Sequence, residues 1–228
     1  MNDNLALEKK ILEQKRKDIL NEVEQKKRYQ EEIQKKLISV TKEAKGSYSQ
    51  EKENTEKIYM LLKKEIENYE EVLKNPYFGR VDFDEKFGSQ EKIYIGKKGI
   101  TSTYDGEEIV VDWRAPVADL YYSGTGGEAY YKAPMGVVEG DLNLKRKFLY
   151  NEENLSKIFD EATNEIIING EEGEGLVDEF LKINLEESRG KKLKEVVATI
   201  QKEQNDIIRW PKNLPIIVQG SAGSGKTT

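Results

Sequence analysis

Apolar residues recur every seven positions through the first part of the chain, among side chains that are mostly charged. One row is aliphatic apart from a single lysine: Leu5, Leu12, Ile19, Lys26, Ile33 and Val40. A second row, four residues further on, is mixed: Lys9, Arg16, Val23, Gln30, Leu37 and Ala44. A heptad repeat predicts a coiled-coil helix, and the polar interruptions predict a seam of moderate strength.

A second helix follows a short turn. Residues 46–49 are Gly, Ser, Tyr and Ser, a composition typical of turns. The helical spacing resumes beyond them at Tyr59, Leu62, Ile66, Tyr69 and Leu73. It must end before Pro76, because the residue before a proline disfavours the helical conformation. Residues 1–75 therefore predict an antiparallel helical hairpin, with helices about 60 Å and about 40 Å long. A dimerising coiled coil or a solvated helical pair is the alternative.

Residues 76–160 have a different character. Short runs of β-branched and aromatic residues alternate with turn signals such as Asp105-Gly106. This pattern predicts a small antiparallel, barrel-like β domain. Residues 147–150 and 156–159 are expected to form the two arms of one hairpin.

The remaining chain returns to helical and mixed patterns. Residues 161–192 are expected to be a helical and linker segment, and a further helix is expected over residues 193–209. Arg209 and Trp210 are expected to pack this helix onto the following strand. Pro215–Gln219 is a short apolar run that predicts a buried parallel strand. Residues 193–228 thus predict the start of a RecA-like α/β domain, and the whole chain an α+β, multi-part fold.

The sequence after that run matches the Walker A pattern without substitution. It reads Gly220, Ser221, Ala222, Gly223, Ser224, Gly225, Lys226 and Thr227, followed by Thr228. Glycines let backbone N–H groups surround phosphate oxygens. Lys226 then supplies positive charge to the β- and γ-phosphates, and the Thr227 hydroxyl binds Mg²⁺. ATP and Mg²⁺ are the expected cofactors. A glycine-rich surface loop that matches by chance is the alternative, which the preceding apolar run disfavours.

Gln204 lies sixteen residues before Gly220, on the expected helix. A glutamine amide can donate to and accept from the N6 and N7 edge of adenine. An isolated glutamine on a charged helix is usually only solvated, so it is the spacing from Gly220 that makes Gln204 a candidate adenine contact.

Composition excludes several classes of chemistry. The chain has no cysteine and no histidine, which excludes disulfides, thiolate chemistry and the usual zinc ligands. Its net charge of -6 argues against a strongly basic nucleic-acid footprint. No apolar run is long enough to predict a signal peptide or a membrane span. We expect a cytoplasmic protein that does not contact a membrane.

Four stretches in residues 75–228 resemble the HelD family, the RNA-polymerase-associated ATPases related to the UvrD and Rep superfamily 1 helicases. They are residues 75–83 (NPYFGRVDF), 93–96 (IYIG), 111–122 (containing VDWRAP and LYY) and 198–227. The resemblance implies a motor whose N-terminal hairpin, residues 1–75, enters the secondary channel of RNA polymerase and helps release nucleic acid and recycle the enzyme. It also implies that Gln204 reads adenine and that residues 220–227 bind phosphate. The sequence leaves open the binding of nucleic acid, through a local patch or through regions outside this sequence.

The hairpin departs from the family in being short. Its turn has no run of adjacent aspartates that could approach a polymerase metal, although Glu51, Glu53 and Glu56 are nearby.

The block from Asp112 to Pro116 has two interpretations. It is either a nucleic-acid or polymerase contact, or a structural element with a buried Trp113 and an ion pair between Asp112 and Arg114. We favour the structural interpretation, since an aromatic residue close to a proline usually packs.

Two other functions are compatible with the sequence: a conventional superfamily 1 DNA helicase or translocase, and a truncated, non-catalytic interaction module. Hydrolysis by this class of ATPase needs an acidic pair and an arginine from a second RecA-like domain. The 228 residues contain neither motif, so alone they are expected to be inactive.

Overall fold

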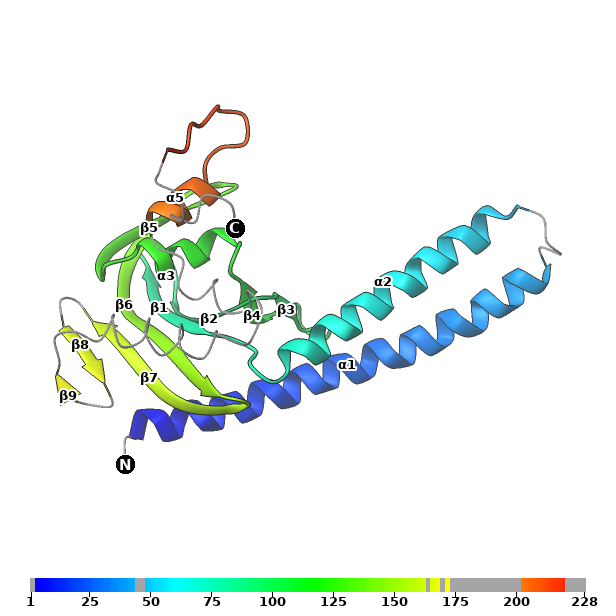
Figure 1. Ribbon diagram of the computed structural model, residues 1–228, viewed down its shortest axis with the longest axis horizontal. Coiled ribbons are helices and arrows are strands. Elements are labelled where there is room, and N and C mark those ends of the chain that lie inside the picture. The colour runs from blue at the N-terminus through cyan, green and yellow to red at the C-terminus, as the bar shows by residue number, and fades with distance from the viewer. Residues whose placement is uncertain (1–2, 44–47, 163–164, 169–170, 173–201, 220–228) are drawn as a thin grey trace.

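The computed structural model describes residues 3–43, 48–162, 165–168, 171–172 and 202–219. Two long helices and a nine-stranded sheet form the bulk of it (Figure 1). The helical elements are α1 (Asp3–Glu43), α2 (Gln50–Val72), the 3₁₀ turn η1 (Pro116–Ala118), α3 (Asp119–Ser123) and α5 (Lys202–Ile208). The strands are β1 (Gly79–Glu85), β2 (Gln90–Gly96), β3 (Ile100–Thr101), β4 (Glu108–Asp112), β5 (Gly127–Ala133), β6 (Gly136–Asn151), β7 (Asn154–Ala162), β8 (Glu165–Ile168) and β9 (Glu171–Glu172).

The predicted helical pair is confirmed, and its ends have identifiable causes. Ser49 caps α2 by accepting a hydrogen bond from the backbone N–H of Lys52 at 3.3 Å. At the other end of α2, Arg16 of α1 donates to the carbonyl oxygens of Leu73, at 3.1 Å, and Lys74. One of the polar interruptions in the heptad rows is therefore a C-terminal cap for the neighbouring helix.

Strand β6 organises the sheet. Its sixteen residues pair with β1 on one side and with β5 and β7 on the other. The predicted hairpin is confirmed as β6 and β7, which are joined at Asn151 and Asn154 with Glu152 in the left-handed region at φ 56°. The sheet is mixed, because β2 and β4 run parallel over a two-residue register.

The barrel-like closure that the sequence predicted is wrong. In the described part of the chain the sheet is open, with the order β3-β4-β2-β1-β6-β7-β8-β9 and β5 beside β6. Closure needs the two outermost strands to hydrogen-bond with each other, and here β3 and β9 are two-residue strands at opposite ends. Helices cover both faces of the central strands, so burial of their apolar side chains does not require closure.

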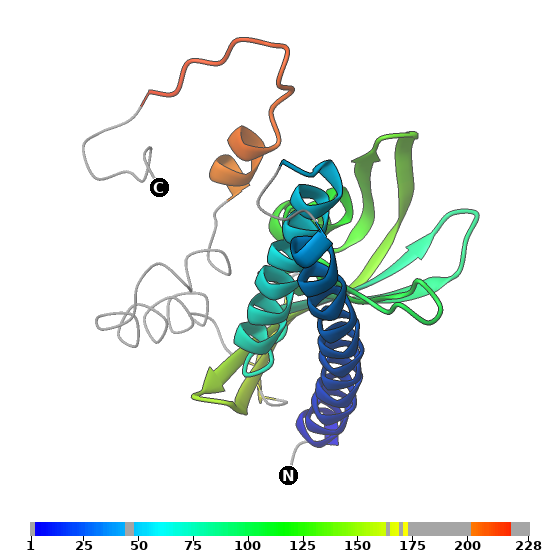
Figure 2. The ribbon, with the colours of Figure 1, turned by 90° about the vertical axis from the view of Figure 1, so that its right-hand side faces the viewer.

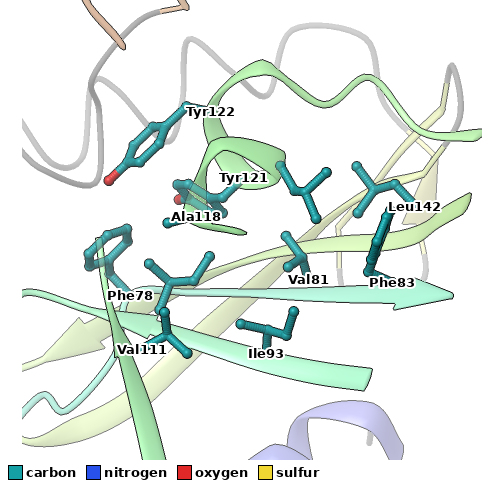
Figure 3. Close-up of a cluster of buried hydrophobic side chains, with 11 residues drawn as sticks. Phe78, Val81, Phe83, Ile93, Val111, Ala118, Tyr121, Tyr122 and Leu142 are labelled. Carbon is teal, nitrogen blue, oxygen red and sulfur yellow. The ribbon is translucent and has the colours of Figure 1, made fainter. Parts of the chain in front are cut away.

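The central strands lie between two helical layers (Figure 1). Side chains alternate along β1, so that Val81 and Phe83 belong to the apolar cluster under η1 and α3. Figure 3 shows Ala118 and Tyr121 lying over these side chains. Gly79 permits this approach, because a Cβ atom there would collide with the Tyr121 ring. The opposite face of the sheet meets α1.

Helix α1 has two different neighbours along its length. Leu12 and Ile19 are buried in the cluster on the sheet, whereas Val23, Ile33 and Val40 are buried residues further along the same helix. Contacts with the body continue to Gln25, whose side-chain oxygen accepts a hydrogen bond from the Thr103 hydroxyl at 2.8 Å.

Beyond Gln25, α1 and α2 pair with each other. Ion pairs join Lys26 to Glu65 at 2.9 Å and Lys36 to Glu51 at 3.2 Å. Figure 2, seen from the tip, shows the two helices side by side in front of the sheet. We call residues 26–66 the arm. The arm's share of α1 is about 27 Å long at a rise of about 1.5 Å per residue. The division of the chain at residue 75 stays a prediction, and contacts between α1 and the sheet cross it.

A buried charge cluster fastens α1 to the sheet. Glu8 has no exposed surface, and its Oε1 accepts from Arg80 of β1 and Arg146 of β6, both at 2.6 Å. Each arginine also forms a two-pronged contact with an aspartate: Arg80 at 2.6 and 2.5 Å with Asp82, and Arg146 at 2.5 and 2.6 Å with Asp160. Burial alone would lower the pKa of Arg80, but Asp82, Tyr94 and Glu8 together outweigh burial and the pKa is raised.

Removal of the central carboxylate tests this cluster. Glu8→Ala leaves two buried guanidinium groups short of an acceptor, so we expect the free energy of unfolding to fall by about 3–5 kcal/mol. Urea denaturation of the purified chain, followed by circular dichroism, measures it. Glu13→Ala, at an exposed position of the same helix, is the control and should change stability by about 0.5 kcal/mol or less. Equal effects of the two substitutions would contradict the role of Glu8.

Glu161 gives the fold a pH dependence. Its burial raises the pKa, but Lys145 and Lys147 outweigh burial, and the pKa lies below its ordinary value of 4.5. The two ion pairs therefore stabilise the fold fully above pH 4.5, and this stabilisation is lost as the pH falls through the lower folded-state pKa. We expect Glu161→Gln to cost about 1 kcal/mol at pH 7 and nothing in strong acid, measured by urea denaturation at a series of pH values. Glu128→Gln, on an exposed strand position, should show no such pH-dependent difference.

Candidate functional site

The nucleotide-binding residues predicted from sequence are only partly described by the structure. Gln204 lies on α5 and is half-buried, whereas Gly220–Thr228 lie outside the described residues. The predicted strand at Pro215–Gln219 is wrong, because these residues have no regular secondary structure and Ile217 is 94% exposed. A parallel strand is held by hydrogen bonds to neighbouring strands, and no described strand lies beside this segment.

Helix α5 is the described part of the helix expected over residues 193–209. Trp210 is 44% exposed, so the prediction that Arg209 and Trp210 pack the helix onto the following strand is wrong. Arg209 instead reaches the loop that follows β4. Its Nη2 donates to the carbonyl oxygen of Trp113 at 3.0 Å, and its Nη1 to that of Ala115 at 3.1 Å.

The loop that receives Arg209 has a fixed shape. The Asp112 carboxylate accepts from the backbone N–H of Arg114 at 2.8 Å, and the Asp112 carbonyl accepts from that of Ala115 at 2.9 Å. The Arg114 guanidinium lies 5.1 Å from the Trp113 ring centroid and 3.4 Å from the Asp112 carboxylate. We call residues 112–116 the DWRAP turn. Trp113 is half-buried against the apolar cluster, and the ion pair lies near the surface.

Asn205 makes the second connection between α5 and the body. It is 1% exposed, and its Nδ2 donates to the Asp119 carboxylate at 2.5 Å and to the Ser123 hydroxyl at 3.0 Å. Its Oδ1 accepts from Arg209 Nε at 2.8 Å. Asp119 also lies 3.4 Å from Arg209 Nε as an ion pair. One polar network therefore runs from α3 through Asn205 and Arg209 to the DWRAP turn.

Helix α3 is itself held by the core. Leu120, Tyr121 and Tyr122 are 1%, 2% and 7% exposed, and Figure 3 shows Tyr121 and Tyr122 beside Ala118 and Phe78. Burial raises the pKa of Tyr121 well above its ordinary value, so the phenol stays neutral. Sequence reasoning missed Asn205 and Asp119 as functional residues. The available signal was their spacing from Arg209 and Ser123, since residues four apart on a helix share a face.

Two of the three glutamates near the tip of the arm, Glu51 and Glu53, form ion pairs with the arm's own lysines. Glu51 pairs with Lys36 at 3.2 Å, and Glu53 pairs with Lys57 at 2.5 Å and accepts from the Tyr48 hydroxyl at 3.1 Å. The hydrogen bond from Lys57 lowers the pKa of Glu53. Among the described residues, no group of three or more acidic, histidine or cysteine side chains is placed to hold a metal ion.

A cleft of about 480 Å³ lies between α1 and the β3–β4 connection. Its charged lining is acidic apart from one lysine: Asp18, Glu22, Asp105, Glu107, Glu108 and Lys15. Burial lowers the pKa of Lys15, although Asp18 and Glu8 oppose the shift. Because a triphosphate is negatively charged, this cleft repels it and is unsuited to be the nucleotide site.

Comparison with known protein families identifies the family to which the chain belongs. A family model described as the N-terminal domain of DNA helicase IV HelD matches residues 5–174, a stretch that includes the arm, the sheet and the DWRAP turn. This chain belongs to that family and carries the N-terminal domain of a HelD-type helicase. No curated protein matches it. None of the helices among the described residues has the length and apolar character needed to span a bilayer.

Proposed function

We propose that this chain is the N-terminal part of an ATP-dependent, helicase-like motor that binds RNA polymerase through its arm, helps to release nucleic acid and recycles the polymerase. The observation that carries the ATP-dependent part is the uninterrupted Walker A sequence from Gly220 to Thr227. Family membership supports the helicase-like part. The proposal includes a cytoplasmic location for the protein.

The proposed nucleotide chemistry is electrostatic. Backbone N–H groups of residues 220–225 and the Lys226 ammonium bind phosphate oxygens, and the Thr227 hydroxyl is a ligand for Mg²⁺. Gln204 reads the adenine edge. Hydrolysis also needs acidic residues and an arginine that further parts of the ATPase supply.

The shape of the arm supports the polymerase-binding part. Two paired helices are about 20 Å across, since one helix with its side chains is about 10–12 Å wide. The pair projects from the body with its last body contacts near Gln25 (Figure 1). A narrow, projecting arm of this kind is a suitable shape for insertion into the proposed polymerase channel. Because Glu51 and Glu53 are already paired with lysines, the proposal gives the arm a docking role and assigns no metal to its tip.

A conventional DNA helicase is the second candidate, and the description of the matching family as DNA helicase IV favours it. The two functions differ in what the full-length protein needs. Stoichiometric binding of core polymerase without DNA supports the first. DNA-stimulated ATP hydrolysis and unwinding without polymerase support the second.

Lys226→Ala tests the nucleotide site in the full-length protein. Loss of the ammonium group removes a charge-assisted contact to the β- and γ-phosphates, so we expect ATP hydrolysis to fall at least about 100-fold. Steady-state phosphate release measures it. Lys212→Ala, at an exposed position before the loop, is the control and should hydrolyse ATP at the unaltered rate. Undiminished hydrolysis by Lys226→Ala would remove the basis of the ATP-dependent proposal.

Shortening the arm tests polymerase binding. The part of α1 from Asp3 to Gln25 lies along the sheet, so the deletion must spare it. Removal of residues 31–60, with a four-residue glycine–serine turn joining the helices, leaves the ion pair between Lys26 and Glu65 in place. We expect affinity for core polymerase to fall at least about tenfold, which corresponds to about 1.4 kcal/mol, with ATP affinity unchanged. Co-sedimentation and nucleotide titration measure the two quantities.

The control for this deletion carries the same glycine–serine turn in place of residues 44–47, without shortening. It should bind polymerase as the unaltered protein does. Equal polymerase affinity of the shortened protein and this control would show that the arm does not mediate binding.

A further inference from the structure

Asn205 of α5 and Arg209, the residue that follows α5, bind the body through their side chains, and the nucleotide chemistry proposed above does not use them. The backbone N–H of Arg209 donates to the Asn205 carbonyl oxygen at 3.0 Å, which continues the last helical turn, so the two side chains, four residues apart, lie on one face. They are linked to each other by the hydrogen bond from Arg209 Nε to Asn205 Oδ1, at 2.8 Å. Gln204 is the immediate neighbour of Asn205. A displacement of this face therefore displaces the residue proposed to read adenine.

The surface that receives these side chains is built from two separate segments. Asp119 and Ser123 present a carboxylate and a hydroxyl from one face of α3, and they are joined to each other by a hydrogen bond of 3.0 Å. The DWRAP turn presents the carbonyl oxygens of Trp113 and Ala115. Asn205 contacts the first segment, and Arg209 contacts both.

The chemistry of Arg209 makes this contact directional. A guanidinium group is planar, so donation from Nη1 and Nη2 to two carbonyl oxygens fixes its orientation as well as its position. Arg209 has a side-chain exposure of 20%, and its positive charge is balanced by Asp119. A lysine at this position can offer one compact ammonium group, which cannot reproduce the two-carbonyl contact.

The receiving surface is rigid because the core holds both of its segments. Leu120 and Tyr121 of α3 are at most 2% exposed, and Trp113 packs against the same apolar cluster. That cluster includes Val81 and Phe83 of β1. The opposite face of β1 carries Arg80, which contacts Glu8 of α1. The position of α5 is thus fixed relative to the sheet, on which α1 also packs.

We propose that Asn205 and Arg209 are positioning residues for nucleotide recognition: by docking α5 on Asp119, Ser123 and the DWRAP turn, they hold Gln204 where it can select adenine. This inference rests on the proposed nucleotide site. The DWRAP turn and α3 then serve as the part of the N-terminal domain that orients the ATPase helix, and base selectivity depends on residues that do not touch the nucleotide.

The test compares ATP with GTP in the full-length protein. Arg209→Ala is expected to raise the KM for ATP at least about fivefold, with the KM for GTP and the kcat at saturating ATP little changed. Gln204→Ala should have the same effect. Arg209→Lys should restore only a small part of the selectivity, because one ammonium group replaces a two-carbonyl contact. Lys212→Ala is the control and should keep both KM values.

A second measurement separates positioning from general loss of structure. Amide hydrogen exchange within residues 202–208 should be faster in Arg209→Ala and in Asn205→Ala, while exchange in β1 and β6 stays slow. If selectivity is lost through unfolding alone, the KM values for ATP and GTP rise together and exchange increases throughout the sheet. That pattern would overturn the inference.

The outcomes also distinguish the inference from the proposed function. If Gln204→Ala abolishes selectivity for ATP and Arg209→Ala leaves it intact, the inference is wrong and the nucleotide site stands. If neither Gln204→Ala nor Lys226→Ala affects ATP hydrolysis, the nucleotide site is wrong and the inference falls with it.

Discussion

The buried carboxylate of Glu8 attaches α1, the helix that continues into the arm, to the central strands of the sheet. Its carboxylate lies between Arg80 and Arg146, at 2.6 Å from each, on adjacent central strands. The cluster is balanced in charge: Glu8 and two aspartates face the two arginines, and Lys15 lies close enough to Glu8 to be influenced by it. In a site closed to water an uncompensated charge would be costly, so this balance restricts α1 to one position on the sheet.

One continuous helix therefore belongs to two structural units. Its first half covers a face of the sheet, and its second half pairs with α2 in the arm (Figure 1). Without a hinge between the halves, a force applied to the arm acts on β1 and β6. The opposite face of β1 packs under α3, which receives α5. Helix α1 and, through α3, helix α5 are thus attached to opposite faces of the central strands.

The structure explains why these residue types occur in the sequence blocks that resemble the HelD family. Arg80 and Asp82 belong to the buried charge cluster, and Gly79 makes room for the Tyr121 ring. The turn that begins at Asp112 and contains Trp113 shapes the surface that receives Arg209. These residues organise the domain, in agreement with the structural interpretation of the Asp112–Pro116 block.

The sequence by itself determined the elements that depend on local chemistry: the helices with their heptad spacing, the turn before the second helix, and the hairpin of residues 147–150 and 156–159. The sequence could not decide what the heptad row packs against. Leu12 packs against the sheet and Ile33 lies within the arm, and both environments require an apolar side chain. The sequence also predicted a barrel and a buried parallel strand at residues 215–219, since a strand pattern does not specify its neighbours. Only the tertiary structure brought Glu8 to Arg146, and Asn205 to Asp119, because each pair is separated by many residues and is joined by the packing of whole elements.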